Sequence, residues 1–195
     1  SKDKIINLIK AGCFDKLLDS REKAMKYYLN LLVPPKKNVT LQNMSKLIEY
    51  DLLPEDLTFE KGVYLFTKEA RKNKDGNGYY VLDEIMYQWF CKWMKQDPPK
   101  FEGIYKINAT KWDAFYDAKM ERVRNYLRTN KEALIQKFHD IEFGMEWDKY
   151  CKGDELQWEL DSLNFYHSGH PLTNVKLPYD VDPITALIDN EFDGY

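Results

Sequence analysis

The sequence predicts a mainly α protein with little or no sheet. Apolar residues recur at helical spacing along most of the 195 residues, and Gly or Pro ends most of these stretches. No alternation of strand and helix patterns is visible, and no repeat of about 20 to 50 residues. With 44% hydrophobic and 15% aromatic residues, the chain has enough apolar material for one domain or two small ones, which argues against disorder.

Two short helices are expected at the amino end. An apolar stripe over residues 5–9 stops before Gly12, because Gly tolerates the left-handed backbone that closes a helix. Ser20 is a suitable N-cap for a second helix, whose apolar stripe over residues 24–32 stops at the paired prolines that follow. The segment is therefore two helices joined by a tight turn with lysines on either side.

Six further helices are expected in the rest of the chain. They cover residues 40–48, 59–72, 80–94, 110–128, 131–143 and 154–165. Thr40 is expected to cap the first, Thr110 and Asp113 to form a capping box on the fourth, and Gly144 to end the fifth. Residues 104–107 are expected to be extended and the acidic C-terminal tail irregular.

The charges are unevenly distributed along the chain. Residues 1–46 carry ten basic against four acidic side chains, and residues 140–195 carry three against thirteen. The net charges of the first, middle and last parts are +6, +1 and -10. A basic end attracts polyanions, although solvated helix faces without a ligand explain the pattern equally well. We expect three parts: residues 1–35, a helical insertion of unknown role over 36–152, and residues 153–195.

The cysteines and the start of the chain indicate a cytoplasmic protein. Cys13, Cys91 and Cys151 are widely spaced and form no C-x-x-C pair, so we expect buried or idle thiols in a reducing compartment. No charged-then-apolar leader opens the chain and no run approaches the roughly 20 apolar residues that cross a bilayer, so no membrane is expected. The first residue is Ser, and we expect a piece excised from a longer protein.

One segment has the spacing of an EF-hand calcium loop. Its candidate ligands are Asn73, Asp75, Asn77, Tyr79 and Glu84, with Gly78 at the sixth position. Only two of these ligands are charged, so calcium would bind weakly. The alternative is a glycine-rich turn between two helices that matches the motif by chance.

Two separated segments resemble one protein family. Residues 4–17 read KIINLIKAGCFDKL and are followed by Arg21; residues 159–172 read ELDSLNFYHSGHPL. They resemble the second helix-hairpin-helix and the F-Y-x-S-G-H-P-L motif of the bacterial DNA polymerase III alpha subunit, a C-family replicative polymerase, in the family's order. Asn164 and His167 depart from that family's pattern. The two segments make up about a sixth of the chain.

The resemblance implies that the first segment binds the phosphate backbone of double-stranded DNA. The residues to which the resemblance assigns this DNA contact are Lys4, Lys10, Ala11, Gly12, Lys16 and Arg21. Backbone N–H groups left unpaired at such a turn can donate to phosphate oxygens, and no contact of this kind reads a base. For the apolar residues Leu8, Ile9, Phe14 and Leu17, ordinary core packing is the better interpretation.

The second segment has no recognisable chemistry of its own. His167, His170 and Ser168 suggest a metal or nucleophile site, but no third ligand lies at a suitable spacing, so a packing role is expected. In the family this string precedes an oligonucleotide-binding barrel. The family's metal-binding catalytic residues and their Mg²⁺ belong to an upstream part, so no catalytic residue and no cofactor is expected here.

The family also carries a short peptide that binds the sliding clamp. Only poor approximations occur here, at residues 96–101 and 136–143, which puts clamp binding through this segment in doubt. The resemblance still implies the sliding clamp and other replisome subunits as candidate partners beside double-stranded DNA. The sequence is therefore interpreted as a non-catalytic, duplex-binding segment of a polymerase III alpha-like replicase. The alternatives are a calcium-responsive helical module and a protein-interaction scaffold, which the aromatic content and acidic tail would suit.

Overall fold

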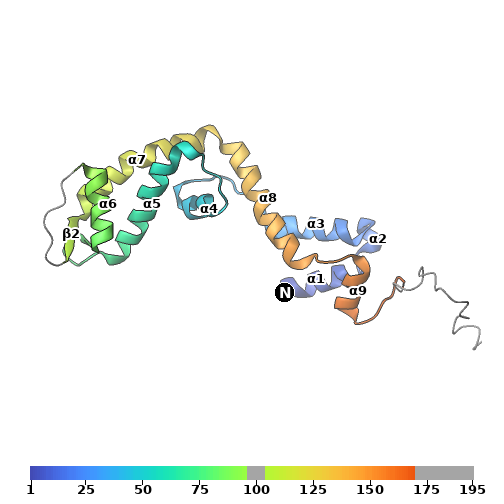
Figure 1. Ribbon diagram of the computed structural model, residues 1–195. Helices are drawn as coiled ribbons and strands as arrows, with labels where there is room; N and C mark the ends of the chain where they lie inside the picture. The colour runs from blue at the N-terminus through green and yellow to red at the C-terminus, as the bar shows by residue number, and fades with distance from the viewer. Residues whose placement is uncertain (96–103, 170–195) are drawn as a thin grey trace, which may run out of the picture. The chain divides into compact units, whose positions relative to one another are not determined.

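A computed structural model describes residues 1–95 and 104–169. The described part is mainly helical and holds one two-stranded sheet (Figure 1). Its elements are α1 (Lys2–Lys10), α2 (Asp15–Leu18), α3 (Arg21–Leu32), α4 (Met44–Glu49), α5 (Thr58–Ala70), α6 (Glu84–Met94), α7 (Ala109–Thr129), α8 (Lys131–Tyr150), α9 (Glu155–Leu163), β1 (Tyr79–Leu82) and β2 (Tyr105–Asn108). Three 3₁₀ turns, η1 (Leu41–Asn43), η2 (Glu55–Leu57) and η3 (Arg71–Asn73), precede α4, precede α5 and follow α5. Within the described ranges, no helix is long and apolar enough to cross a membrane.

The chain divides into two compact units. Among the described residues, one contains residues 1–32 and 145–169, and the other contains the described part of residues 33–144. We call them the terminal unit and the central unit. The first and last described segments of the sequence therefore share one unit, which is relevant because they carry the two family-like motifs.

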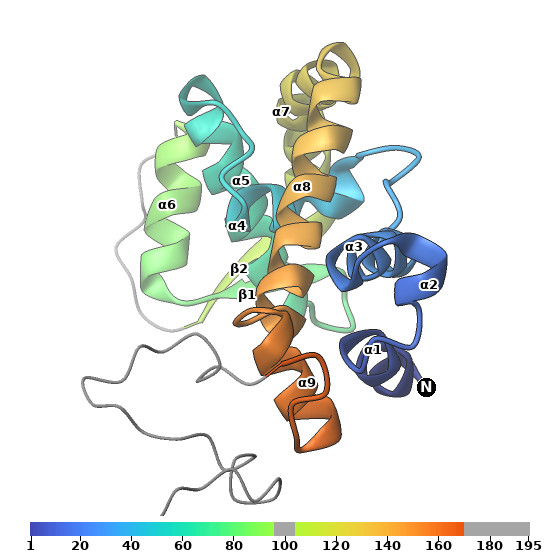
Figure 2. The same ribbon diagram turned by 90° about the vertical axis from the view of Figure 1, so that its right-hand side faces the viewer.

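The terminal unit is built from α1, α2, α3, α9 and the end of α8. Helix α1 lies against both α9 and α3, and α2 lies against α3 (Figure 2). Its core includes Ile6 and Ile9 from α1, Met25 and Leu29 from α3, and Trp158 from α9. The spacing of the α1 and α3 residues matches the expected helical stripes, which bury one face of each helix.

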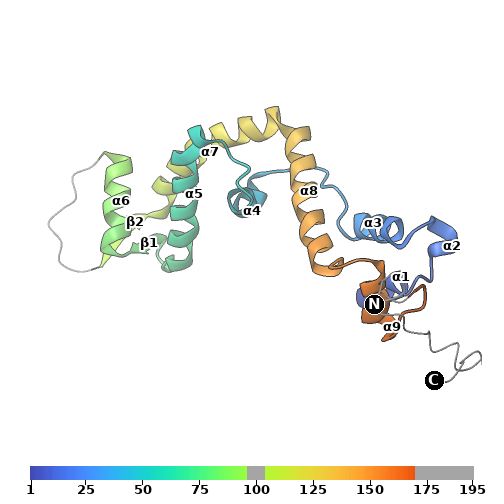
Figure 3. The same cartoon turned by 45° about the vertical axis from the view of Figure 1, so that its right-hand side comes forward.

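The central unit is organised around α5 and α7. Trp112 of α7 is fully buried against Phe66 of α5, with ring centroids 4.6 Å apart. The Trp112 indole Nε1 donates to the Thr67 hydroxyl at 2.9 Å, which satisfies the one polar atom of this large side chain. Strands β1 and β2 pair antiparallel, with Tyr80 opposite Ile107, beside α5, α6 and α7 (Figure 3).

Several expected element boundaries are wrong. Residues 79–82 form a strand and not the start of a helix, because the helix begins only after Asp83, whose side chain accepts the Met86 N–H at 2.8 Å. Asn108, and not Thr110, caps α7 by accepting the Lys111 N–H at 3.0 Å. Helix α8 continues through Gly144 to Tyr150, since a helical Gly costs only about 1 kcal/mol and packing outweighs it.

Other expectations are confirmed. Thr40 caps η1 through a capping box with Asn43, and the extended stretch expected at residues 104–107 is β2, at 105–108. The last expected helix is α9, with Asp154 as its N-cap. All three cysteines are free; Cys91 and Cys151 are buried, whereas Cys13 is exposed. The tail from residue 170 onward, His170 included, lies outside the described residues.

Candidate nucleic-acid interface

Most backbone N–H groups of the turn between α1 and α2 are hydrogen-bonded to nearby backbone carbonyls. The Gly12 N–H donates to the Ile9 carbonyl at 3.0 Å, the Cys13 N–H to the Leu8 carbonyl at 3.0 Å, and the Asp15 N–H to the Gly12 carbonyl at 3.2 Å. The expectation that the amides of this turn are left free is therefore wrong for these three groups. Only the Phe14 and Lys16 amides of residues 12–16 have no acceptor among the described residues.

Gly12 is required by the side chains packed against it. Its φ is +81°, in the left-handed region that a side chain disfavours. A Cβ added here would lie 2.7 Å from Asp15 Oδ2 and 2.9 Å from Arg21 Nη2. The close approach that Gly12 permits is thus an approach to Arg21, inside the protein.

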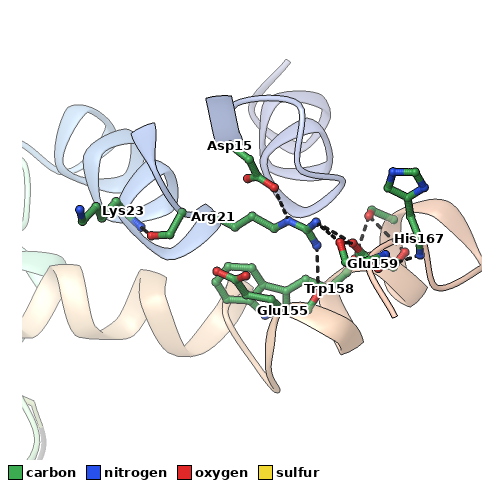
Figure 4. Close-up of polar contacts among 10 residues, drawn as sticks. Asp15, Arg21, Lys23, Glu155, Trp158, Glu159 and His167 are labelled. Carbon is green, nitrogen blue, oxygen red and sulfur yellow. Dashed lines mark hydrogen bonds and ion pairs between the residues drawn. The ribbon is translucent and has the colours of Figure 1, made fainter. Parts of the chain in front are cut away.

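Arg21 lies under the turn and is buried, with 5% of its surface exposed. Its Nε donates to Asp15 Oδ2 at 3.0 Å, and its Nη1 to the Glu155 carbonyl at 3.3 Å. Its Nη2 donates to Glu159 Oε1 at 2.6 Å and to Ser168 Oγ at 2.9 Å (Figure 4). A guanidinium held in this way does not face solvent, so the structure does not support Arg21 as a phosphate ligand.

Glu159 is the acidic partner of this network and is fully buried. Its Oε2 accepts the backbone N–H groups of His167 at 2.8 Å and Ser168 at 3.0 Å, and its Oε1 also accepts the Ser168 hydroxyl. Burial acts to raise the pKa of this carboxyl, but the bonds from Ser168, Arg21 and His167 outweigh it and lower the pKa to about 2. Glu159 is therefore ionised and paired with Arg21 at neutral pH.

The two family-like segments meet in this network. The hairpin segment contributes Gly12, Asp15 and Arg21, and the second segment contributes Glu159, His167 and Ser168. The second segment therefore packs against the hairpin as expected: its Glu159 and Ser168 hold Arg21, which lies beneath the hairpin.

The lysines of the hairpin segment differ in exposure. Lys4 and Lys16 are exposed, and no carboxylate among the described residues pairs with either. Only 13% of the Lys10 side chain is exposed, and its Nζ lies 3.9 Å from Asp161. Lys23 and Lys26 are exposed but pair with Asp19 and Glu22. The free positive charge at the hairpin therefore comes from Lys4 and Lys16.

The apolar residues of the hairpin do not all pack in the core. Ile9 is buried and Phe14 is half-buried, as expected. Leu8 and Leu17 are exposed to 47% and 76%, so the expectation that they are core residues is wrong.

The candidate calcium residues lie in the central unit, where η3 leads into β1. The Asp75 Oδ1 accepts the N–H groups of Asn77 at 3.0 Å and Tyr79 at 2.8 Å, and its Oδ2 lies 3.2 Å from Lys106 Nζ. The Tyr79 N–H and the Lys106 ammonium lower the pKa of Asp75. Both carboxylate oxygens thus face hydrogen-bond donors, which is the opposite of what a cation ligand needs. Asn73 ends η3 and Glu84 begins α6, where it accepts from Gln88.

The described residues do not present the clamp peptide in an extended form. The approximation at residues 96–101 lies outside the described ranges, and the one at residues 136–143 is part of α8. Within the described ranges, no group of three or more His, Cys, Asp or Glu side chains is placed to hold a metal ion.

Comparisons with known proteins show similarity to DNA polymerases. The chain is 29% identical over 191 residues to a protein described as a probable DNA polymerase, YorL, of Bacillus subtilis (strain 168), and equally to a DNA-directed DNA polymerase of Bacillus phage SPbeta. The match covers 92% of this chain but only 14% of each relative. No protein-family profile and no solved structure matches the sequence.

Proposed function

We propose that this chain is a non-catalytic, duplex DNA-binding segment of a DNA polymerase III alpha-like replicase. The similarity to two DNA polymerases supports a polymerase parent. The two family-like motifs lie in one unit and share the buried Arg21–Glu159 pair, which supports the assignment of both to a single DNA-binding element. Nucleotide transfer and its Mg²⁺ belong to parts of the parent outside this chain.

The proposed contact is made by the hairpin segment with the phosphate backbone. Lys4 and Lys16 supply unpaired positive charge, and Lys10 contributes less because Asp161 lies beside it. Ala11 and Gly12 shape the turn, and Arg21 holds it in place from inside. Lysine contacts with phosphates release counterions and read no base, so binding is independent of sequence and weakened by salt.

The observation that carries the proposal is the exposure of Lys4 in α1 and Lys16 in α2, the two helices joined by a turn whose shape is fixed from beneath. The test uses two double variants. One carries both Lys4→Ala and Lys16→Ala. The control carries both Lys23→Ala and Lys26→Ala, which removes the same charge from lysines that already have carboxylate partners. Affinity for a labelled duplex is measured by fluorescence anisotropy over a salt series. Loss of two phosphate contacts lowers the slope of log Kd against log salt by about 2 in the first variant only. Equal slopes in both variants would contradict the proposal.

A further inference from the structure

A group of basic residues lies where α7 meets α8 in the central unit. Residues 122–131 contain Arg122, Arg124, Arg128 and Lys131 and no carboxylate. Residues 33–48 contain three lysines and again no carboxylate. Both segments lie in the central unit and contribute to one hollow, the first through Arg124, Arg128 and Lys131 and the second through the uncharged residues 38–42.

The hollow has a volume of about 650 Å³ and is open to solvent. Its walls are the residues before and in η1, which include Thr40 and Gln42, and the end of α7 with the start of α8, which supply Arg124, Arg128 and Lys131. Val39 and Leu127, both buried, also line it. None of its lining residues is acidic.

The three cations differ in how far they are free to bind a ligand. The Arg128 side chain is 74% exposed and forms a long ion pair with Glu121, at 3.8 Å. Lys131 is exposed, and no carboxylate among the described residues pairs with it. Arg124 is held by Asp117 at 3.2 Å and Glu121 at 3.1 Å, which fixes its position. Lys131 is therefore free to take a new anion, and the exposed Arg128 can do so in exchange for its contact with Glu121.

The opposite wall is held by local hydrogen bonds. The Thr40 hydroxyl accepts the Gln42 N–H at 3.3 Å, and the Asn43 side chain accepts the Thr40 N–H at 3.1 Å. A fixed wall lowers the entropy cost of binding. A second hollow of about 450 Å³ shares Arg128 and Lys131 and extends over residues 128–133, with Glu132 as its acidic lining residue.

We infer that this basic hollow is a second binding site for the phosphate backbone of duplex DNA, with Arg128 and Lys131 as its phosphate ligands. Arginine and lysine that line one open hollow are suited to phosphate oxygens, and a phosphate can replace Glu121 as the partner of Arg128. The open shape of the hollow and the absence of acidic residues from its lining fit a polymer of phosphates. This inference rests on the proposed function, because it assumes that the chain works on DNA.

The test compares two double variants of the whole chain that lose the same charge. Arg128→Ala with Lys131→Ala removes the proposed ligands, and Lys92→Ala with Lys111→Ala removes two exposed lysines of the same unit that do not line the hollow. Circular dichroism melts establish that each variant is folded. We expect the first variant to lose about tenfold in duplex affinity and to lower the salt slope by about 2, and the second to change affinity less than about twofold. Equal effects of both variants would overturn the inference.

The hairpin variant Lys4→Ala with Lys16→Ala, measured in the same titration, separates the two proposals. If it weakens binding while the Arg128 and Lys131 variant does not, the inference fails and the proposed function stands. If the reverse holds, the hollow is a DNA site and the hairpin assignment fails.

A free nucleotide is the competing source of phosphate. If dATP raises the melting temperature of the wild-type chain but not of the Arg128 and Lys131 variant, and duplex affinity is unchanged in that variant, the hollow binds nucleotides and the backbone assignment is overturned.

Discussion

Arg21 and Glu159 are 138 residues apart in the sequence and form a buried ion pair with an Nη2–Oε1 distance of 2.6 Å. The pair joins a hairpin at one end of the chain to a helix and turn near the other. A buried charge without a partner is strongly disfavoured, so each residue requires the other. The shape of the hairpin thus depends on a segment that is distant in sequence.

The first prediction concerns this pair. Arg21→Met or Glu159→Gln alone should lower the free energy of unfolding by about 3 to 5 kcal/mol, because each leaves the other side chain without its partner. Arg21→Met combined with Glu159→Met should cost less than the sum of the two single changes to Met, giving a coupling above about 1 kcal/mol. Urea unfolding measures these values.

Lys23→Ala serves as the control, since it breaks the exposed pair with Asp19 and should cost less than about 1 kcal/mol. Strict additivity of the Arg21 and Glu159 changes would show that the two side chains do not interact in solution.

The second prediction concerns acid. The pKa of Glu159 is lowered from its usual value of 4.5 to about 2, so the ionised pair stabilises the fold fully above about pH 4.5. That stabilisation is lost as the pH falls from 4.5 towards 2. The melting temperature of the wild-type chain should therefore fall more steeply over this range than that of Glu159→Gln. Parallel curves for the two proteins would disprove the assignment.

The third prediction concerns two glycines with the same backbone conformation. Gly12 and Gly78 both have φ +81°, but a Cβ would collide with Asp15 and Arg21 only at Gly12. Gly78→Ala should cost about 1 to 2 kcal/mol for the left-handed backbone alone. Gly12→Ala should cost roughly 1 to 3 kcal/mol more from overpacking. Equal losses in urea unfolding would mean that the space beside Gly12 is not filled.

The fourth prediction concerns calcium. The Asp75 carboxylate already accepts hydrogen bonds from Lys106 and two backbone amides. Millimolar calcium should therefore leave the melting temperature of the chain unchanged. Differential scanning fluorimetry with and without a chelator measures this. A saturable rise that is lost in Glu84→Gln would instead establish the EF-hand interpretation.

The helices of this protein were largely predictable from local patterns. The apolar stripes of α1 and α3 and the cap Thr40 are signals carried by neighbouring residues. The strand at residues 79–82 was missed because a short, dense apolar run has the same appearance in a strand and in a buried helix. The Asp83 cap was the local signal that could have separated strand from helix.

The candidate site was predictable only in part. The motif strings located the turn at Gly12, but they do not show which way Arg21 points. That direction is set by Glu159 and Ser168, which no local pattern connects to the hairpin. The same limit explains Leu8 and Leu17: apolar character predicts burial on average, whereas exposure depends on which elements pack nearby.

The most direct test of the account is an amine-acylation footprint of the intact chain with and without duplex DNA, read by peptide mass spectrometry. We expect DNA to protect Lys4 and Lys16, whose ammonium groups are exposed and unpaired, and to leave the labelling of Lys23 and Lys26 unchanged. Undiminished labelling of Lys4 and Lys16 in a saturated complex would contradict the claim that the hairpin contacts the phosphate backbone.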